Sequence, residues 1–257
     1  MSAASDRRTE ASVVAAWRAL GDRRAAPDRR WVARLTGASR ERVDATLGEA
    51  DELLPFDREI GAAHRAGGRP SYAQIRAPLE LYAIVRLARP DHVVEVGVSS
   101  GVSSAHFLLG LRRNRHGTLH SIDFPTFARA DRPGPQESPV AIPRGKSSGW
   151  AVPDRLRVGW DLRIGRSEEL LPSLVAELPS VGLFLHDDLH TPAHLAFELR
   201  TVEPRLARGA VVLADNTVWT GRAFPRWAKH LGVPWFRRRR SDLVGLRTPD
   251  RSGVGGR

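Results

Sequence analysis

Two apolar segments of this chain run into side chains that could bind a cation. Residues 181–185 lead to Asp187, and residues 210–214 lead to Asp215 and Asn216. Because parallel strands deliver their carboxyl ends to one edge of a sheet, we expect these three side chains to lie close together. Carboxylate and amide oxygens without thiolates suit a hard divalent cation such as Mg²⁺. We therefore predict that Asp187, Asp215 and Asn216 bind a metal, with a plain strand-ending turn as the alternative for Asp215 and Asn216.

A third apolar segment ends in a turn that contains glycine. Residues 93–96 precede Gly97, Ser99 and Gly101, and a helix-like apolar segment follows. A strand, a glycine turn and a helix N-terminus together present backbone N–H groups to a ligand. The dinucleotide pattern G-x-G-x-x-G is not met, because Ser99 stands at its second glycine. Glu95 lies just before the turn, where its carboxylate would hold an ammonium group or the water around it; chance glycines in an ordinary turn are the alternative.

A fourth short strand pattern, residues 117–122, ends in Asp123, which lies 22 residues after Gly101. An acid at the tip of the second strand is placed to bind the two hydroxyls of an adenosine ribose. An aspartate that only caps a turn is the alternative. Taken with the glycine turn, Asp123 favours a cofactor that contains a nucleoside.

The pattern Glu95-x-Gly97-x-x-x-Gly101 resembles the first motif of the class I S-adenosylmethionine-dependent methyltransferases. The step of 28 residues from Asp187 to Asp215, followed directly by Asn216, resembles the metal triad of Mg²⁺-dependent O-methyltransferases that act on catechols, sugars and macrolides. The resemblance covers residues 93–216. It implies S-adenosylmethionine and Mg²⁺ as cofactors and a small molecule as substrate.

The same resemblance suggests roles for further residues. His190 matches a general base of some sugar-modifying members, whereas a cap on the following helix is the alternative. Relatives usually carry an aspartate in place of Arg166, where it contacts the adenine amine; arginine cannot accept that hydrogen bond, so adenine must be recognised differently. His186 either contacts adenine or is a histidine at a strand end whose hydrogen bonds are made within the protein. The predicted cofactor-binding residues are Glu95, Gly97, Ser99, Gly101, Ser103, Asp123, Ser167, His186 and Asp187.

The remaining patterns predict the elements that position these residues. Helical spacing occurs at 78–87, 191–206 and 223–231, a third strand at 156–164, and Ser167 is a predicted helix N-cap. Segments 234–240 and 243–247 predict a terminal hairpin, in which four consecutive arginines alternate across a strand. We expect a Rossmann-like α/β fold with a mostly parallel seven-stranded sheet and a C-terminal antiparallel hairpin, as the resemblance implies.

Two segments lie outside this regular pattern. Residues 1–75 are predicted to be a helical extension, with helices at 9–20 and 39–54 and Ser39 as an N-cap, ahead of a methyltransferase domain at 76–250. Such extensions cap the site or build a dimer in related enzymes, so a homo-oligomer is expected by analogy. Residues 124–153 are rich in proline and glycine and predict either a lid over the site or a plain solvent loop.

Composition limits the other classes of function. The chain has no cysteine, which excludes disulfides and thiolate metal sites, and it shows neither a membrane-length apolar run nor a secretory signal, so we expect a cytoplasmic protein. The formal charge of +11 comes almost wholly from scattered arginines. Nucleic-acid binding would favour a contiguous basic face with interleaved aromatics, so it is not expected.

The sequence therefore predicts transfer of a methyl group from S-adenosylmethionine to a hydroxyl of a natural product or sugar, with Mg²⁺ and a histidine base. Three alternatives stay open: a metal-free methyltransferase acting on nitrogen or oxygen, a protein of this fold that binds the cofactor without catalysis, and a nucleic-acid-binding protein.

Overall fold

The computed structural model describes residues 27–49, 59, 60, 62, 77–125, 142 and 146–250. A seven-stranded sheet in the order β3-β2-β1-β4-β5-β7-β6 organises this part of the chain. All pairings are parallel from β3 to β5, whereas β7 runs antiparallel to both β5 and β6. The strands are β1 (His92–Val96), β2 (Thr118–Asp123), β3 (Asp161–Ile164), β4 (Val181–His186), β5 (Leu206–Ala214), β6 (Trp235–Arg237) and β7 (Val244–Arg247). The predicted fold, including the terminal antiparallel hairpin, is confirmed.

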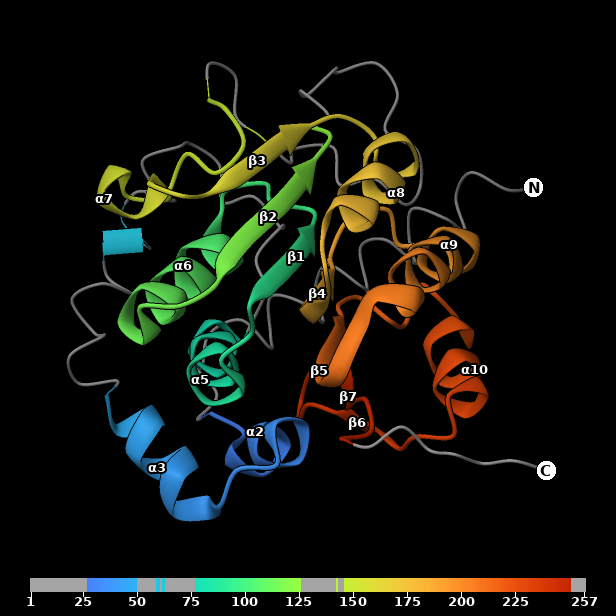
Figure 1. The fold of residues 1–257 in the computed structure, drawn as a ribbon, viewed down its shortest axis with the longest axis horizontal. Coiled ribbons are helices and arrows are strands. Elements are labelled where there is room, and N and C mark those ends of the chain that lie inside the picture. The colour runs from blue at the N-terminus through green and yellow to red at the C-terminus, as the bar shows by residue number, and fades with distance from the viewer. Residues whose placement is uncertain are drawn as a thin grey trace, which may run out of the picture.

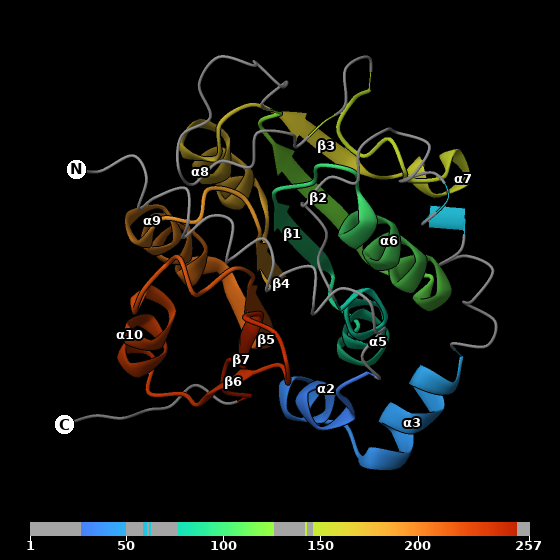
Figure 2. The same cartoon turned by 180° about the vertical axis from the view of Figure 1, so that it is seen from behind.

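Helices cover both faces of the sheet (Figure 1). They are α2 (Arg29–Thr36), α3 (Arg40–Gly48), α5 (Pro78–Ala88), α6 (Val102–Asn114), α7 (Asp154–Arg157), α8 (Ser167–Glu177), α9 (Pro192–Val202) and α10 (Ala223–His230), with a 3₁₀ turn η1 (Glu203–Arg205). In the reverse view, α5 and α6 lie on one side of the strands and α8, α9 and α10 on the other (Figure 2). The central strands are buried on both faces, which explains their continuous apolar sequence.

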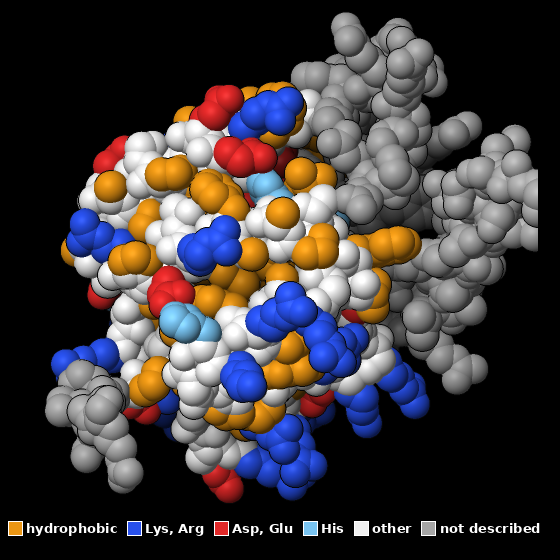
Figure 3. Space-filling model, turned by 90° about the vertical axis from the view of Figure 1, so that its right-hand side faces the viewer, with side chains coloured by type: hydrophobic (Ala, Val, Ile, Leu, Met, Phe, Trp, Pro, Cys, Tyr) orange, Lys and Arg blue, Asp and Glu red, His pale blue; other side chains and the backbone are white. Residues whose placement is uncertain are grey.

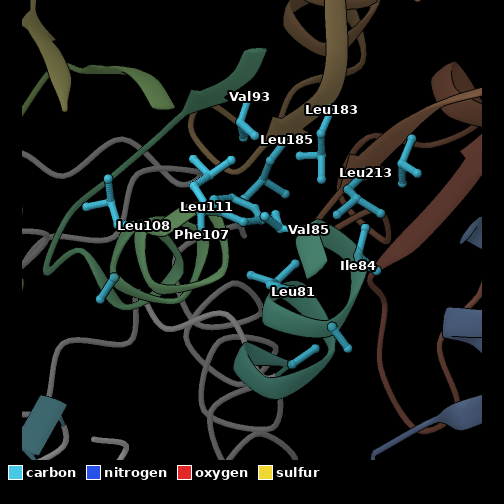
Figure 4. Packing of buried hydrophobic residues seen from close by; sticks show 14 of the residues in the cluster. Leu81, Ile84, Val85, Val93, Phe107, Leu108, Leu111, Leu183, Leu185 and Leu213 are labelled. Carbon is cyan, nitrogen blue, oxygen red and sulfur yellow. The ribbon is translucent and has the colours of Figure 1, made fainter. Parts of the chain in front are cut away.

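Each face of the sheet has its own apolar core. Leucine and valine side chains of β1, β4 and β5 point toward α5 and α6, where Leu81, Val85 and Phe107 pack against them (Figure 4). Alternate residues of the same strands point the other way and pack against α8, α9 and α10. This alternation follows from the two-residue repeat of a strand. It also decides which face each residue at a strand tip will meet.

The N-terminal helices α2 and α3 join the α5 side of the sheet. Trp31 and Leu35 belong to the same core as α5, and the Trp31 indole donates to the Phe236 carbonyl at 3.0 Å. Ser39 caps α3 as predicted, accepting from the N–H of Arg42 at 3.4 Å. The predicted helix at 9–20 lies outside the described residues, and the boundary between an extension and a domain near residue 75 stays a prediction.

Several predicted boundaries were wrong, and the helix predicted at 39–54 already ends at Gly48. Residues 154–157 form α7, so β3 begins only at Asp161, because the apolar run before it packs as a short helix and turn. Helix α9 ends at Val202, since Pro204 lies in η1 and β5 already starts at Leu206. Arg166 rather than Ser167 is the N-cap of α8, and it makes no side-chain cap.

Positive charge is distributed over the surface. On the face shown in Figure 3, arginine and lysine side chains stand among apolar and acidic ones, with several gathered toward the lower edge. Arg238, in the run of four arginines, is buried and pairs with Glu80 of α5 at 2.7 Å. The four arginines therefore do not form one surface patch. Their predicted alternation across a strand is wrong, because β6 ends at Arg237 and residues 238–240 lie in the turn that follows. Within the described residues, no helix has the length and apolar character needed to span a membrane.

Candidate functional site

The strand order reverses between β1 and β4, and ligands of open α/β sheets bind at the carboxyl ends of the strands beside such a reversal. Gly97 follows β1 with φ +90°, and a Cβ there would lie 2.1 Å from the Asp187 carbonyl oxygen. Only glycine permits this approach of the β1 turn to the β4 tip. Gly101, at φ +86°, begins α6 without a side-chain cap, which leaves N–H groups of the first helical turn for a ligand.

Glu95 is fully buried beneath this turn. Its carboxylate accepts hydrogen bonds from the hydroxyls of Ser103 at 2.5 Å, Ser104 at 2.6 Å and Ser121 at 2.7 Å. Burial raises the pKa of Glu95 to about 7, and the three hydroxyls oppose that rise. Glu95 thus ties the start of α6 to the sheet through Ser103, and its predicted contact with the cofactor stays a prediction.

Asp123 ends β2 beside the glycine turn, as predicted. One carboxylate oxygen accepts from the Val98 N–H at 3.0 Å, and the other accepts from the Ser148 hydroxyl. Burial raises the pKa of Asp123. Both oxygens are already hydrogen-bonded within the protein, so a ribose would have to share or replace the Ser148 contact.

The end of the proline- and glycine-rich loop is packed against the site. The Gly149 N–H donates to the Ser99 carbonyl at 2.7 Å, and the Ala151 N–H donates to the Ser100 carbonyl at 2.9 Å. Ala151 and Val152 are buried. Residues 148–152 are therefore part of the packed structure around the turn. Most of the rest of the predicted lid lies outside the described residues.

The tips of β2 and β3 carry an exposed apolar edge. Phe124 is 52% exposed and Ile164 58% exposed. The Arg166 guanidinium lies 4.8 Å from the centre of the Phe124 ring. Arg166 therefore stacks on an aromatic ring next to Asp123, rather than offering the acceptor that an aspartate would provide.

The tips of β4 and β5 bring Asp187 and Asp215 together. Burial, together with nearby carboxylates including that of Asp242, raises the pKa of each to about 8, although His186 opposes the rise at Asp187. Asp242 lies in the turn between β6 and β7, where its carbonyl accepts from the Thr217 hydroxyl. Asp215 is buried and Asp187 is partly buried, and neighbouring carboxylates in such surroundings favour the approach of a cation.

Asn216 and His190 complete this group. Asn216 adopts the left-handed conformation at φ +53°, and its side-chain nitrogen lies 3.2 Å from Nε2 of His190. Nε2 of His190 also lies 3.5 Å from an oxygen of Asp187. The amide therefore donates to the imidazole, which leaves Oδ1 of Asn216 buried and without a hydrogen-bond partner. Burial and the neighbouring His186 lower the pKa of His190 to about 4, so its ring is neutral at physiological pH.

The other residues of the β4 tip point toward α9. Nδ1 of His186 lies 2.7 Å from Glu198, and Asp188 lies 3.0 Å from Nε2 of His194. His194 also contacts Glu198 at 3.1 Å and Glu168 at 3.3 Å. Its two ring nitrogens both face carboxylates, so the ring is a cation, and these carboxylates raise its pKa to about 10 against the effect of burial.

His186, Asp188 and Glu198 lie close enough together to hold a metal ion, but the two carboxylates already contact the imidazoles of His186 and His194. The pKa of Asp188 is accordingly lowered to about 2, because the His194 bond and the two nearby histidines outweigh burial. The predicted metal ligands are the other group, Asp187, Asp215 and Asn216, and metal binding there stays a prediction. His186 faces α9 and keeps a free, buried Nε2, so its predicted contact with adenine stays a prediction.

The structure brings the predicted metal ligands and His190 together, and it places the predicted cofactor residues around the tips of β1, β2 and β4. Ser167 differs from the other predicted cofactor residues. Its hydroxyl lies within hydrogen-bond distance of Asp188 and His194. Sequence reasoning missed four participants: Ser148, His194, Glu198 and Asp242. The pairing of His194 with Glu198 could have been predicted, because they stand four residues apart on one helix. Ser148 and Asp242 reach the site from segments distant in sequence.

Comparison with known proteins agrees with this geometry. A sequence model of the family described as a methyltransferase domain matches residues 94–217, a range that contains the tips of all five parallel strands. A candidate O-methyltransferase of Mycobacteroides abscessus is 28% identical over 183 residues, which cover 69% of this chain and 75% of that protein. The matched domain and the relative support a class I S-adenosylmethionine-dependent methyltransferase. The predicted family is confirmed, and the similarity is to O-methyltransferases.

Solved structures share the methyltransferase fold. A candidate O-methyltransferase from Klebsiella pneumoniae superposes with a TM-score of 0.55 at 17% identity, covering 78% of this chain and 94% of the other. The O-methyltransferase TomG from Streptomyces achromogenes, which is involved in tomaymycin synthesis and was crystallised with S-adenosylmethionine, gives 0.51 at 20% identity, covering 75% and 89%. At these identities the superpositions establish the fold of this methyltransferase.

Proposed function

We propose that this methyltransferase transfers the methyl group of S-adenosylmethionine to a hydroxyl of a small molecule with the help of Mg²⁺ held by Asp187, Asp215 and Asn216. The observation that carries the proposal is the group formed at the tips of β4 and β5 by the buried Asp215, the partly buried Asp187 and the buried, unpartnered Oδ1 of Asn216. Burial and neighbouring carboxylates raise the pKa of both acids to about 8. Related O-methyltransferases support the choice of a hydroxyl acceptor.

The donor set fits the ion. Oδ1 of Asn216 is a buried oxygen without a hydrogen-bond partner, and its amide nitrogen is held by His190. Two carboxylates and one amide oxygen leave room for water or substrate oxygens, which octahedral Mg²⁺ requires. When bound, the ion supplies a Lewis acid that lowers the pKa of an acceptor hydroxyl.

The cofactor site fits the β1 turn. S-adenosylmethionine supplies a methyl group on a positively charged sulfur. We assign its binding to the Gly97–Gly101 turn, the first turn of α6 with Ser103, and Asp123, because these lie at the strand tips beside the reversal in strand order. The Ser100 hydroxyl in that turn is buried without a hydrogen-bond partner. Arg166 and Phe124 lie at the edge of the sheet where we expect adenine to bind, and neither offers an acidic side chain to it.

His190 is the candidate base. Its ring is neutral above about pH 4 and can accept a proton. The adjacent Asp187 oxygen, 3.5 Å from Nε2, would stabilise the imidazolium that results. His190 also orients Asn216, and so its loss would affect two functions that experiments can separate.

The acceptor would meet an apolar surface beside the carboxylates. Val218 and Trp219, which directly follow Thr217, are 60% and 43% exposed. The Trp219 N–H donates to the Asn216 carbonyl at 3.0 Å, and this contact places the tryptophan next to the proposed metal ligand. An acceptor with an apolar or aromatic part next to its hydroxyl suits this surface.

Calorimetric titration tests the proposal without knowledge of the acceptor. S-adenosylhomocysteine and Mg²⁺ should both bind the wild-type protein, whereas Asp215→Ala should retain S-adenosylhomocysteine and lose Mg²⁺. Asp250→Ala is the matched control, because Asp250 is an exposed aspartate paired with Arg247. Unaltered Mg²⁺ binding by Asp215→Ala, or wild-type protein that binds S-adenosylhomocysteine but no Mg²⁺, would contradict the metal assignment and favour a metal-free methyltransferase.

A further inference from the structure

The turn after β4 sends its side chains to two sides. His186 and Asp188 contact residues of α9, whereas Asp187 contacts His190, which in turn contacts Asn216 at the edge of the sheet. Five consecutive positions therefore carry both a polar anchor and the proposed catalytic group. The position of Asp187 and His190 depends on how firmly the anchor side is held.

The anchor consists of buried, charged contacts. Glu198 is fully buried and has one oxygen 2.7 Å from Nδ1 of His186 and the other 3.1 Å from Nε2 of His194. Nε2 of His194 also lies 3.0 Å from Asp188. Each carboxylate is thus matched by an imidazole, and the two residues on α9 bind both anchor side chains of the turn.

Two helix starts are tied to the same anchor. Thr191 caps α9 by accepting from the His194 N–H at 3.1 Å, and its own N–H donates to the Leu189 carbonyl at 2.8 Å. The Ser167 hydroxyl, in the first turn of α8, lies 2.9 Å from His194 and 3.1 Å from Asp188. The turn is therefore fixed to the N-termini of α8 and α9, and not only to the end of β4.

We propose that His194 and Glu198 are positioning residues that hold His186 and Asp188 and thereby place Asp187 and His190 for metal binding and methyl transfer. This inference rests on the proposed function of Asp187 and His190. A network behind a metal site orients the ligands by fixing the backbone and ring directions, although it touches neither metal nor substrate. Small displacements of groups that must align with a reacting atom lower the rate strongly.

The experiment compares Glu198→Gln, Glu198→Ala and His194→Gln with His230→Gln. His230 of α10 also pairs with a glutamate, Glu203 at 3.2 Å, but it is exposed and lies outside the network. Two readouts apply to the full-length protein in the presence of S-adenosylhomocysteine. They are the affinity for Mg²⁺ by calorimetry and the deuterium uptake of peptides that span residues 186–191.

We expect His194→Gln and Glu198→Ala to weaken Mg²⁺ binding on the order of tenfold and to raise uptake across 186–191, with S-adenosylhomocysteine affinity unchanged. Glu198→Gln, which keeps an acceptor for one histidine, should show a smaller change, and His230→Gln none. A general loss of stability would instead raise deuterium uptake throughout the protein. It would also give Glu198→Gln and Glu198→Ala the same uptake across 186–191.

The inference is overturned if the network variants fold and show wild-type uptake at 186–191, or if uptake rises while Mg²⁺ affinity equals that of His230→Gln. Failure of the proposed function gives a different result, since wild-type protein would then bind no Mg²⁺ at all. Should His194→Gln fail to fold, Glu198→Gln provides the same comparison with the carboxylate replaced by an amide of equal size.

Discussion

Asp187 and Asp188 are adjacent in the sequence, yet their surroundings shift their pKa values in opposite directions. The pKa of Asp187 rises to about 8, because burial and nearby carboxylates disfavour its charge. The pKa of Asp188 falls to about 2, because the bond to the His194 cation outweighs its burial. One aspartate is already neutralised by the protein, and the other is not.

This difference separates a structural group from a binding group. A carboxylate matched by a histidine cation contributes to folding and has little need of a ligand. A carboxylate buried beside another carboxylate is held in an unfavourable state that a bound cation relieves. Both clusters contain acids and histidines at short distances, so composition alone would not distinguish them.

Asparagine substitutions at Asp187 and Asp188 should give the largest difference in stability. Asp188→Asn leaves the His194 cation without one of its partners and should lower the free energy of unfolding by about 3 kcal/mol. Asp187→Asn removes one of two opposed carboxylates and should leave stability unchanged or higher. Urea unfolding at pH 7.5 without metal measures both; equal losses would contradict the distinction.

His190 variants test the binding side next. His190→Ala should lower methyl transfer on the order of a hundredfold if the ring acts as a base. His190→Gln retains a group able to hold the Asn216 amide, so it should preserve Mg²⁺ affinity while losing turnover. A variant pair that loses Mg²⁺ affinity and turnover in parallel would instead make His190 an orienting residue for Asn216.

The stabilisation provided by Mg²⁺ should depend on pH. Asp187 and Asp215, with pKa values near 8, keep protons in the folded, metal-free protein that the unfolded chain has released. The metal-free protein therefore becomes less stable as pH rises from 6.5 to 8, and Mg²⁺ binds more tightly over the same range. With free Mg²⁺ at about ten times its Kd, the gain is about 1.4 kcal/mol.

Thermal unfolding at pH 6.5 and pH 8.5, with and without Mg²⁺, measures this effect. His194 also titrates above pH 6.5, but its contribution is the same with and without the ion and cancels in the difference. A stabilisation by Mg²⁺ that is equal at both pH values would show that the carboxylates do not release protons on binding.

The smallest effect on stability is expected at the edge of the cluster formed by His186, Asp188, His194 and Glu198. Glu168 is half-exposed and lies 3.3 Å from Nδ1 of His194. Glu168→Gln should cost about 0.5 kcal/mol or less, because water screens the pair. Urea unfolding beside Asp188→Asn provides the scale; a cost comparable to Asp188→Asn would place Glu168 inside the cluster.

Much of the fold could be predicted because its signals are local. The apolar runs before Gly97, Asp187 and Asp215 are long enough to require buried strands, and parallel strands must present their ends at one edge. The glycine turn and the metal-ligand candidates follow from that edge alone. The errors at residues 156–160 and 203–209 occurred where short apolar or proline-containing stretches permit more than one local structure.

The meeting of acids and an amide at neighbouring strand tips could be predicted from the residues, because alternation and strand direction are properties of the chain. The placement of Asp188 beside a cation and of Asp187 near another acid arises in the folded molecule. That outcome depends on His194 and Asp242, which reach the β4 tip from a helix face and a distant hairpin turn. Their effect on a charge comes from distance and burial, and neither quantity is written in local sequence.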